Sequence, residues 1–501
     1  MKFALPALLT ALLSVVPIWA GPKVAVVVGT DAPKLERFAA EEIAAQFKRL
    51  FDADATVANT IPSAFENLIL VGSPTTNPAV AAVLGDGWPK LTDQGHILRS
   101  VTLKDRKALV VGGGSPVATL WAAYELGQHF GIRPFLHGDV LPEKVPELKL
   151  DGIDIKFEPA TNVRVWRLMG TSPTSYGGWG LAEYKTLFRQ LAKLKFNYVQ
   201  LGSSKDQKPI PVAGDTPGRK AFKGAKEFDI ADLLGKTGAE RQAAAQALDR
   251  GVAESAVEYG LDVKPLPKLQ LAWVSMRGFL PRVPVNSLSD GMGFDISADV
   301  PGDLGPAVYH LARRAFEPKL TPKEAFTQYF TPIVGTASTE RVLLGIGLLG
   351  EAEKLVESAD KKFELSPDFV ANLLKSGDAP PEWWKKAGKH YAGAMDEMYR
   401  GIRATYNDPA RPVLLYYAKR SEFAVQFFNC LDATRLAGAA RKAGDKDAEL
   451  QHLEKATESI YNALNAYGDV ARDPSDRGAI ALLAETIYRP LMSELKAASK
   501  K

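Results

Sequence analysis

The chain has 501 residues, of which 46% are hydrophobic and 24% are charged, close to the proportions of ordinary globular proteins. This composition excludes a disordered chain, a collagen-like chain and a protein that crosses a membrane many times. The 62 basic and 58 acidic residues leave a net charge of +4, too small over this length to predict a nucleic-acid partner. The single cysteine, Cys430, excludes a disulfide within the chain and a cysteine-based zinc site. At roughly 100–200 residues per domain, the length predicts about three domains.

Residues 1–20 are typical of a secretory signal peptide. Lys2 supplies the positive start, residues 3–16 are apolar, and Ala20 stands before the expected cleavage point. The apolar run is too short for an ordinary transmembrane helix, and a retained anchor is the alternative. We therefore expect an exported protein, periplasmic or extracellular. No later apolar stretch suggests a bilayer span, so we expect no membrane span after cleavage.

Residues 21–158 are predicted to form an α/β domain. β-branched and apolar runs predict strands at 23–28 and 68–71, and residues 95–103 and 108–111 predict a hairpin. Apolar residues recur at helical spacing over 35–50 and again over 116–130. Two helices among several strands predict a mixed sheet layered with helices.

A glycine run, Gly112-Gly113-Gly114, lies between a predicted strand and a predicted helix. Such a loop can hold phosphate at the helix N-terminus. However, Val117 occupies the third glycine position of a dinucleotide-binding motif, and no P-loop Lys-Ser or Lys-Thr pair follows. We favour a tight turn that brings the helix back onto the sheet.

Residues 159–305 alternate between strand and helix patterns. The sequence predicts strands at 163–166, 196–201 and from 261, with a further strand at 270–274, and helices at 181–195 and 239–259. This alternation predicts a parallel α/β layer.

Residues 306–501 are predicted to be all helical and to form a bundle. Prolines punctuate the region where helices can start but not continue. Asp473 or Ser475 is expected to cap the last predicted helix. Seven helices are predicted, at 306–316, 322–330, 339–359, 381–406, 412–443, 447–472 and 475–498.

Motifs for metal binding or nucleophilic catalysis are absent from the sequence. The six histidines form no H-E-x-x-H pattern, and no serine lies in a G-x-S-x-G elbow. We therefore predict no metal and no cofactor. Carboxylates remain for acid–base chemistry, and Asp295 and Asp299 are the catalytic candidates because they lie in or near a Gly-rich segment. Asp299 and Asp303 are equally suited to cap a helix ahead of Pro306.

Arginines and tryptophans near the first strand of the middle region are candidates for holding a ligand. Arg164 and Arg167 could grip a carboxylate in a bidentate way, and the indole faces of Trp166 and Trp179 could stack on sugar rings. Packing in the core or on the surface is the alternative role for each of the four.

Several patterns in the N-terminal region carry a family resemblance: FAAEEI at 38–43, LVG at 70–72, GHIL at 95–98, LVVGG at 109–113, and the stretch 124–133. The region resembles the accessory α/β domain of exported glycoside hydrolases of the alpha-glucuronidase and beta-N-acetylhexosaminidase type. In those families this domain packs beside a TIM barrel and is not itself catalytic. Residues 179–197 are similar to the opening helix and strand of such a barrel.

The resemblance implies hydrolysis of O-glycosidic bonds by paired carboxylates at the barrel's C-terminal face. The catalytic acids of these families match no position in this chain. About 150 residues lie between Thr161 and His310, whereas a barrel takes about 250 and at least about 200. The middle region is therefore expected to be a reduced or incomplete (β/α) barrel.

Two functions remain open. The first is an exported glycoside hydrolase that acts on a polysaccharide or oligosaccharide with Asp295 or Asp299 as acid or base. The second is a non-catalytic carbohydrate-binding or scaffold protein derived from such an enzyme. Two carboxylates that face each other across an open pocket at strand C-termini would favour the first. The expected domains are 1–20 signal peptide, 21–158 accessory, 159–305 barrel-like and 306–501 helical.

Overall fold

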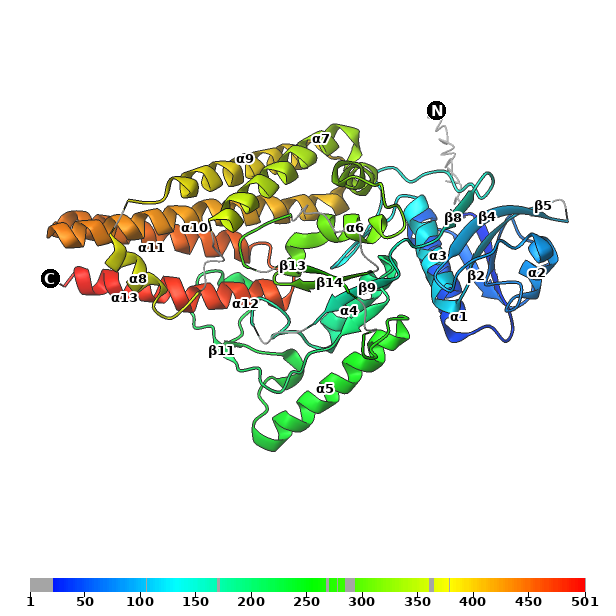
Figure 1. Cartoon of the computed structure of the whole chain (residues 1–501), viewed down its shortest axis with the longest axis horizontal. Helices are drawn as coiled ribbons and strands as arrows, with labels where there is room; N and C mark the ends of the chain where they lie inside the picture. The colour runs from blue at the N-terminus through cyan, green and yellow to red at the C-terminus, as the bar shows by residue number, and fades with distance from the viewer. Residues whose placement is uncertain are drawn as a thin grey trace, which may run out of the picture.

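The computed structural model describes residues 21–104, 106–168, 172–266, 270–276, 278–283, 293–359, 365–377 and 379–500. The proposed signal peptide and Gly291-Met292 of the Gly-rich segment lie outside these ranges. Figure 1 shows a sheet covered by helices at one end of the molecule, a bundle of long helices at the other, and a second sheet between them.

The first sheet has six strands in the order β2-β1-β3-β5-β4-β8. The first four strands in this order run parallel, and β4 pairs antiparallel with both β5 and β8. Helices α1 and α3 cover one face and α2 the other (Figure 1), so both faces are apolar. The elements are β1 Lys23–Val28, α1 Lys34–Phe51, β2 Asp54–Ala58, β3 Asn67–Val71, α2 Pro78–Leu84, β4 His96–Leu103, β5 Arg106–Gly113, α3 Pro116–His129 and β8 Asp154–Phe157. The predicted mixed sheet with helices is confirmed.

The glycine run allows β5 to pack closely against the neighbouring loop and helix. A Cβ on Gly112 would lie 2.3 Å from the carbonyl oxygen of Gly72, and one on Gly113 would lie 2.5 Å from the backbone of α3. The side chain of Ser115 caps α3 by accepting from the amide of Ala118. Close packing therefore accounts for these glycines.

The second sheet has four strands in the order β10-β9-β14-β13, all parallel. A short antiparallel pair, β6 with β7, precedes it, and a second pair, β11 with β12, lies between its helices. The elements are β6 Arg133–Phe135, β7 Gly138–Val140, β9 Val163–Arg167, α4 Leu181–Lys193, β10 Tyr198–Gln200, β11 Ile210–Pro211, β12 Glu227–Phe228, α5 Gly238–Glu258, β13 Ala272–Met276 and β14 Gly293–Ala298.

The described residues do not build an eight-stranded barrel. Asp262 forms an isolated parallel bridge with Tyr198 at the β10 edge of the sheet. Ala272 begins β13 at the opposite edge of the sheet, so within the described residues the two edges are only ten positions apart in the sequence. The first strand, β9, pairs directly with the last strand, β14, as the first and last strands of a closed barrel would.

The C-terminal part is a large helical region, as predicted. The helices are α6 Gly305–Arg314, α7 Pro322–Ser358, α8 Phe369–Ser376, α9 Glu382–Ala404, α10 Arg411–Ala443, α11 Lys446–Gly468, α12 Pro474–Leu483 and α13 Arg489–Ala498. The sequence patterns split α7 in two, and the structure has a kink at that point, where Gly335 takes a φ of 74°. The side chain of Asp473 caps α12, as predicted for this position. Helix α8 was not predicted.

One of the described helices, α7, is long and apolar enough by composition to cross a membrane, although half of its most apolar stretch is buried in the protein. The kink at Gly335 divides it, and it packs against α9 (Figure 1). The absence of a membrane span after residue 20 stays a prediction.

Candidate functional site

The strand register sorts the predicted residues onto the two faces of the second sheet. Successive side chains of a strand point to opposite faces, so Arg164 and Trp166 share one face, whereas Arg167 lies on the other. Asp295 is the register partner of both Val165 and Trp273. Arg167, Trp273 and Asp295 therefore share a face, and this group is called the Arg167–Trp273 site below.

Arg167 links the other two members of this site. Its Nε donates to Oδ1 of Asp295 at 3.2 Å, and its Nη2 donates to Oδ2 of the same carboxylate. Its guanidinium carbon lies 4.5 Å from the ring centroid of Trp273. Asp295 is 3% exposed, and a carboxylate so buried needs a charged partner, which Arg167 supplies. The indole of Trp273 is 55% exposed and can meet a ligand from solvent.

Sequence reasoning selected Arg167 and Asp295 separately but missed Trp273. The signal was present, because residues 270–274 were predicted as a strand that contains this tryptophan. Only the pairing of β13 with β14 brings it beside Arg167, and that pairing is not visible from local sequence.

Arg164 and Trp166 are completely buried on the opposite face. The Arg164 guanidinium donates to the carbonyl oxygens of Lys195 and Thr161, each at 2.6 Å, and lies between the rings of Trp121 and Phe316. Burial lowers its pKa to about 9. Arg164 therefore fastens the second sheet to the N-terminal region and offers no surface to a sugar.

Trp166 and Trp179 are both packed against protein. Nε1 of Trp166 donates to the hydroxyl of Tyr176 at 2.7 Å, and Nε1 of Trp179 donates to the hydroxyl of Ser475 on α12 at 2.7 Å. Trp179 is 3% exposed. Each indole directs its single donor to the protein, and the indole faces are covered, so packing is their role in this structure.

Asp299 lies one residue beyond β14, where its Oδ2 accepts from the amide of Gly278 at 3.0 Å. Asp303 is ion-paired with Arg420, whose Nη2 lies 2.7 Å from Oδ2. Neither carboxylate caps α6, because the residue at that cap is Leu304 and no side chain bonds there. The capping alternative for both is therefore wrong.

Asp295 and Asp299 have different partners, Arg167 and the Gly278 amide. Glycoside hydrolysis requires two carboxyl groups about 5–9.5 Å apart across the scissile bond. Both oxygens of Asp295 accept from Arg167, so the protein itself already engages this carboxylate.

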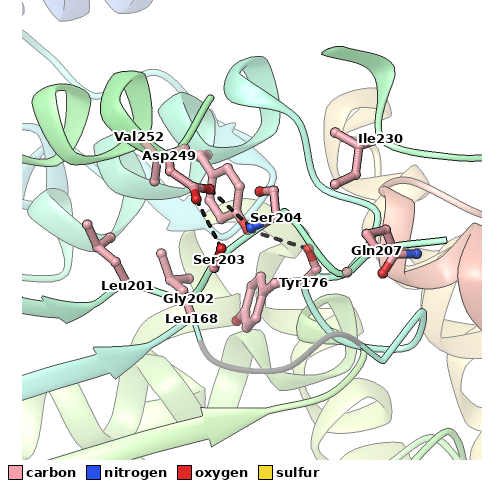
Figure 2. A pocket seen from close by; sticks show the side chains of 12 residues that line it. Leu168, Tyr176, Leu201, Gly202, Ser203, Ser204, Gln207, Ile230, Asp249 and Val252 are labelled. Atoms are coloured by element: carbon pink, nitrogen blue, oxygen red, sulfur yellow. Dashed lines mark hydrogen bonds between the residues drawn. The ribbon is translucent and has the colours of Figure 1, made fainter. Parts of the chain in front are cut away.

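A small pocket lies where β9 and β10 end (Figure 2). Leu168 and Leu201, which directly follow these strands, line it together with Tyr176, Tyr184 and Asp249 of α5. The Asp249 carboxylate accepts from the hydroxyl of Ser203 and the amide of Ser204, each at 3.1 Å. The volume of this pocket is about 20 Å³, which is room for a single water molecule and too small for a sugar ring.

Within the part of the chain that the structure describes, no three His, Cys, Asp or Glu side chains gather closely enough to hold a metal ion. The absence of a metal and of a cofactor stays a prediction from the sequence.

Residues 21–126 match the family model for the glycosyl hydrolase family 67 N-terminus. The resemblance to alpha-glucuronidase- and hexosaminidase-type glycoside hydrolases predicted from the sequence is therefore confirmed. Among solved structures, the chain is similar to a family GH115 4-O-methyl-alpha-glucuronidase, BtGH115A, with specificity for decorated arabinogalactans. The TM-score is 0.55 at 12% identity, over 92% of this chain and 79% of that one.

Two further structures match over most of their length. A GH138 enzyme targeting pectin rhamnogalacturonan II has a TM-score of 0.42 at 8% identity, and the match covers 96% of this chain and 99% of that one. CpGH84D has a TM-score of 0.41 at 10% identity, and the match covers 89% of this chain and 91% of that one. No curated protein matches the sequence.

Proposed function

We propose that this chain is an exported carbohydrate-binding protein built on a glycoside-hydrolase-like fold, and that the Arg167–Trp273 site holds a polysaccharide or oligosaccharide without cleaving it. The observation that carries this proposal is the half-exposed indole of Trp273 beside a guanidinium that Asp295 holds in place.

The chemistry of this site suits a sugar. An exposed indole face offers the apolar side of a sugar ring a flat surface, and burying it contributes hydrophobic stabilisation. The Arg167 side chain, which is 17% exposed, places positive charge at the edge of that surface, where hydroxyl or carboxylate oxygens are attracted to it. Because Asp295 holds Arg167 in place, this charge is preorganised and less entropy is lost when a ligand binds.

Hydrolysis is less well supported than binding. Both oxygens of Asp295 accept from Arg167, and Asp299 accepts from the Gly278 amide, so the protein already engages each carboxylate. Such a site would bind a sugar without hydrolysing its glycosidic bond. The domain division at 21–158, 159–305 and 306–501 belongs to this proposal, with the ligand site in the middle segment.

The test is to measure binding to a panel of plant and bacterial polysaccharides by affinity electrophoresis and calorimetry. We expect Trp273→Ala to weaken binding at least about tenfold, since burying about 60 Å² of apolar surface contributes roughly 1.5 kcal/mol of hydrophobic stabilisation. Tyr406→Ala is the matched control, because Tyr406 is an 88% exposed aromatic outside the site. Equal losses in both variants, or no binding by the wild type, would contradict the assignment.

Turnover is assayed on the same protein with aryl glycosides, including glucuronides and N-acetylglucosaminides. Because the similar GH115 structure is that of a 4-O-methyl-alpha-glucuronidase, alpha-glucuronides are the first substrates to test. We expect no turnover. Turnover that disappears in Asp295→Asn would replace the binding proposal with the hydrolase.

Export is supported by the signal-peptide pattern of residues 1–20 and by a family match that begins at residue 21, directly after the expected cleavage point. Mass spectrometry of the mature protein from a native host should give Gly21 as the first residue. Recovery of the uncleaved chain in the membrane fraction would favour the retained anchor.

A further inference from the structure

Helix α7 carries an apolar groove that nothing in the described chain covers. Beyond the kink at Gly335, residues exposed at alternating spacings of four and three form a stripe along one side of the helix: Glu340, Leu344, Gly347, Glu351 and Lys354. The groove beside this stripe has a volume of about 560 Å³, and Phe326 from the other half of α7 contributes to its wall. Leu344 is 54% exposed and is the apolar side chain of this stripe.

Two of the three charged residues on the stripe, Glu340 and Lys354, have opposite signs and lie at equal distances from Gly347. Glu340 precedes this glycine by seven residues and Lys354 follows it by seven, which is about 10 Å along the axis on each side. If a second copy of the helix lies antiparallel with the two-fold axis at Gly347, each Glu340 faces Lys354 of the second copy. In a parallel arrangement Glu340 would instead face Glu340 of the second copy, and Lys354 would face Lys354.

The centre of the stripe allows two helices to approach closely. A Cβ placed on Gly347 would meet no atom within 4 Å, so the surface there is open, and the glycine leaves room for a facing backbone. In the antiparallel arrangement the exposed Leu344 of each copy lies one turn from the axis, where it can enter the groove of the other. A two-fold interface requires such self-complementarity, in which the same patch serves both copies.

We propose that the α7 stripe is the contact surface of a homodimer in which two copies pack antiparallel about Gly347. A contact of two helices and their groove walls lies at the lower end of specific interfaces in area, so the dimer should be reversible, with a dissociation constant on the order of micromolar. Lys354 already lies 2.7 Å from Glu351 of its own helix, so Glu340 of the second copy adds a second carboxylate to an existing pair.

Sedimentation of the mature full-length protein over about 1–200 μM tests the proposal, because this range brackets a micromolar constant. The wild type should pass from monomer to dimer. Leu344→Asp should raise the dissociation constant at least tenfold. Leu415→Asp, at a 37% exposed leucine on α10, should leave it unchanged. Circular dichroism checks that both variants keep the helix content of the wild type.

Charge reversal tests the antiparallel geometry. Glu340→Lys alone should weaken the dimer several-fold, and Glu340→Lys combined with Lys354→Glu should restore it. A wild type that stays monomeric throughout, or dimerisation that survives Leu344→Asp, overturns the proposal. A double variant no tighter than Glu340→Lys overturns the assigned axis. A monomer that cosediments with phosphatidylcholine–phosphatidylglycerol vesicles overturns the proposal in favour of a membrane contact.

Discussion

Burial decides the role of most charged residues at the centre of this molecule. Arg420 has no exposed surface, and its guanidinium donates to both oxygens of Asp303 and to the carbonyl oxygen of Phe279 while lying 3.9 Å from the ring centroid of Tyr467. Removing one partner of such a pair typically costs about 3–5 kcal/mol, because the other charge stays buried. These charges fasten the helical part to the end of β14.

Glu353 on α7 is a buried carboxylate without such a dedicated partner. Burial raises its pKa to about 7, and Glu357 and Asp303 add to the rise, while Arg282 opposes it. Between pH 4.5 and 7 the folded protein holds this proton more firmly than the unfolded chain does, so its contribution to stability falls as the pH rises through this window and is constant above it.

We therefore predict that Glu353→Gln stabilises the protein at pH 8 by up to about 3 kcal/mol and has little effect near pH 4.5. Thermal unfolding midpoints at pH 4.5, 6 and 8 measure this. Glu254→Gln, at an exposed position on α5, is the control and should change no midpoint by more than a degree or so. The same shift at all three pH values would mean that the substitution acts through packing and not through the proton.

The predictions for single residues succeeded where chemistry was local and failed where the face of a strand mattered. Arg164 and Arg167 lie in one strand, and their types alone could not tell which would face the helices. Once β9 pairs with β14 and β10, the alternation of side chains puts Arg164 under Trp121 and Arg167 beside Asp295. Register is a long-range property and is absent from any short window of sequence.

The kink of α7 makes a prediction at the scale of one element. Gly335 has a φ of 74° and a ψ of 162°, a conformation essentially restricted to glycine, and a Cβ there would lie 2.0 Å from a carboxylate oxygen of Glu143. Gly335→Ala should lower the free energy of unfolding by about 1–3 kcal/mol. Urea titration followed by helix circular dichroism measures the change.

Gly388 in α9 is the matched control for this substitution. It lies in a regular helix, and a Cβ there would meet no atom within 4 Å. Gly388→Ala should therefore stabilise the protein by about 0.5–1 kcal/mol through helix propensity. If both alanine variants change stability in the same direction, the strain assigned to Gly335 is not the cause.

The long helices were predictable because their signals are local. Prolines at 412, 474 and 322 stand in first turns, and apolar residues repeat at helical spacing over several turns. The short elements gave no such signal. β2 lies at the edge of its sheet with mostly exposed side chains, and α8 has only eight residues, so its apolar spacing extends over too few turns to stand out.

The order of the strands emerges only at the scale of the whole molecule. The count of residues predicted too little chain for a complete barrel, and the four-stranded second sheet agrees with that shortage within the described ranges. Nothing local in the sequence predicts that β14 returns beside β9, because strand pairing between residues more than 120 positions apart depends on how the intervening segments pack. The Arg167–Trp273 site exists only because of that return.

Three parts of the molecule meet at one buried carboxylate, Glu125 of α3. Lys195, which follows α4, donates to it at 2.6 Å, and Arg313 of α6 donates to both its oxygens at 2.8 and 2.9 Å. Although burial by itself raises the pKa of Glu125, these two cations outweigh that effect and hold it well below the usual range. The carboxylate is therefore charged at any ordinary pH and ties the N-terminal region to both neighbours.

Glu125→Gln should loosen this junction, because Lys195 then lies buried without a carboxylate, while Arg313 keeps Glu317. We expect the free energy of unfolding to fall by about 3–5 kcal/mol. The single calorimetric transition expected for the wild type should divide into two, because the N-terminal region then unfolds separately. Asp154→Asn is the control, because the Asp154 side chain is 70% exposed in its pair with Arg99 and should contribute under about 1 kcal/mol. A single transition at the wild-type temperature in Glu125→Gln would show that apolar packing, and not this ion pair, couples the three parts.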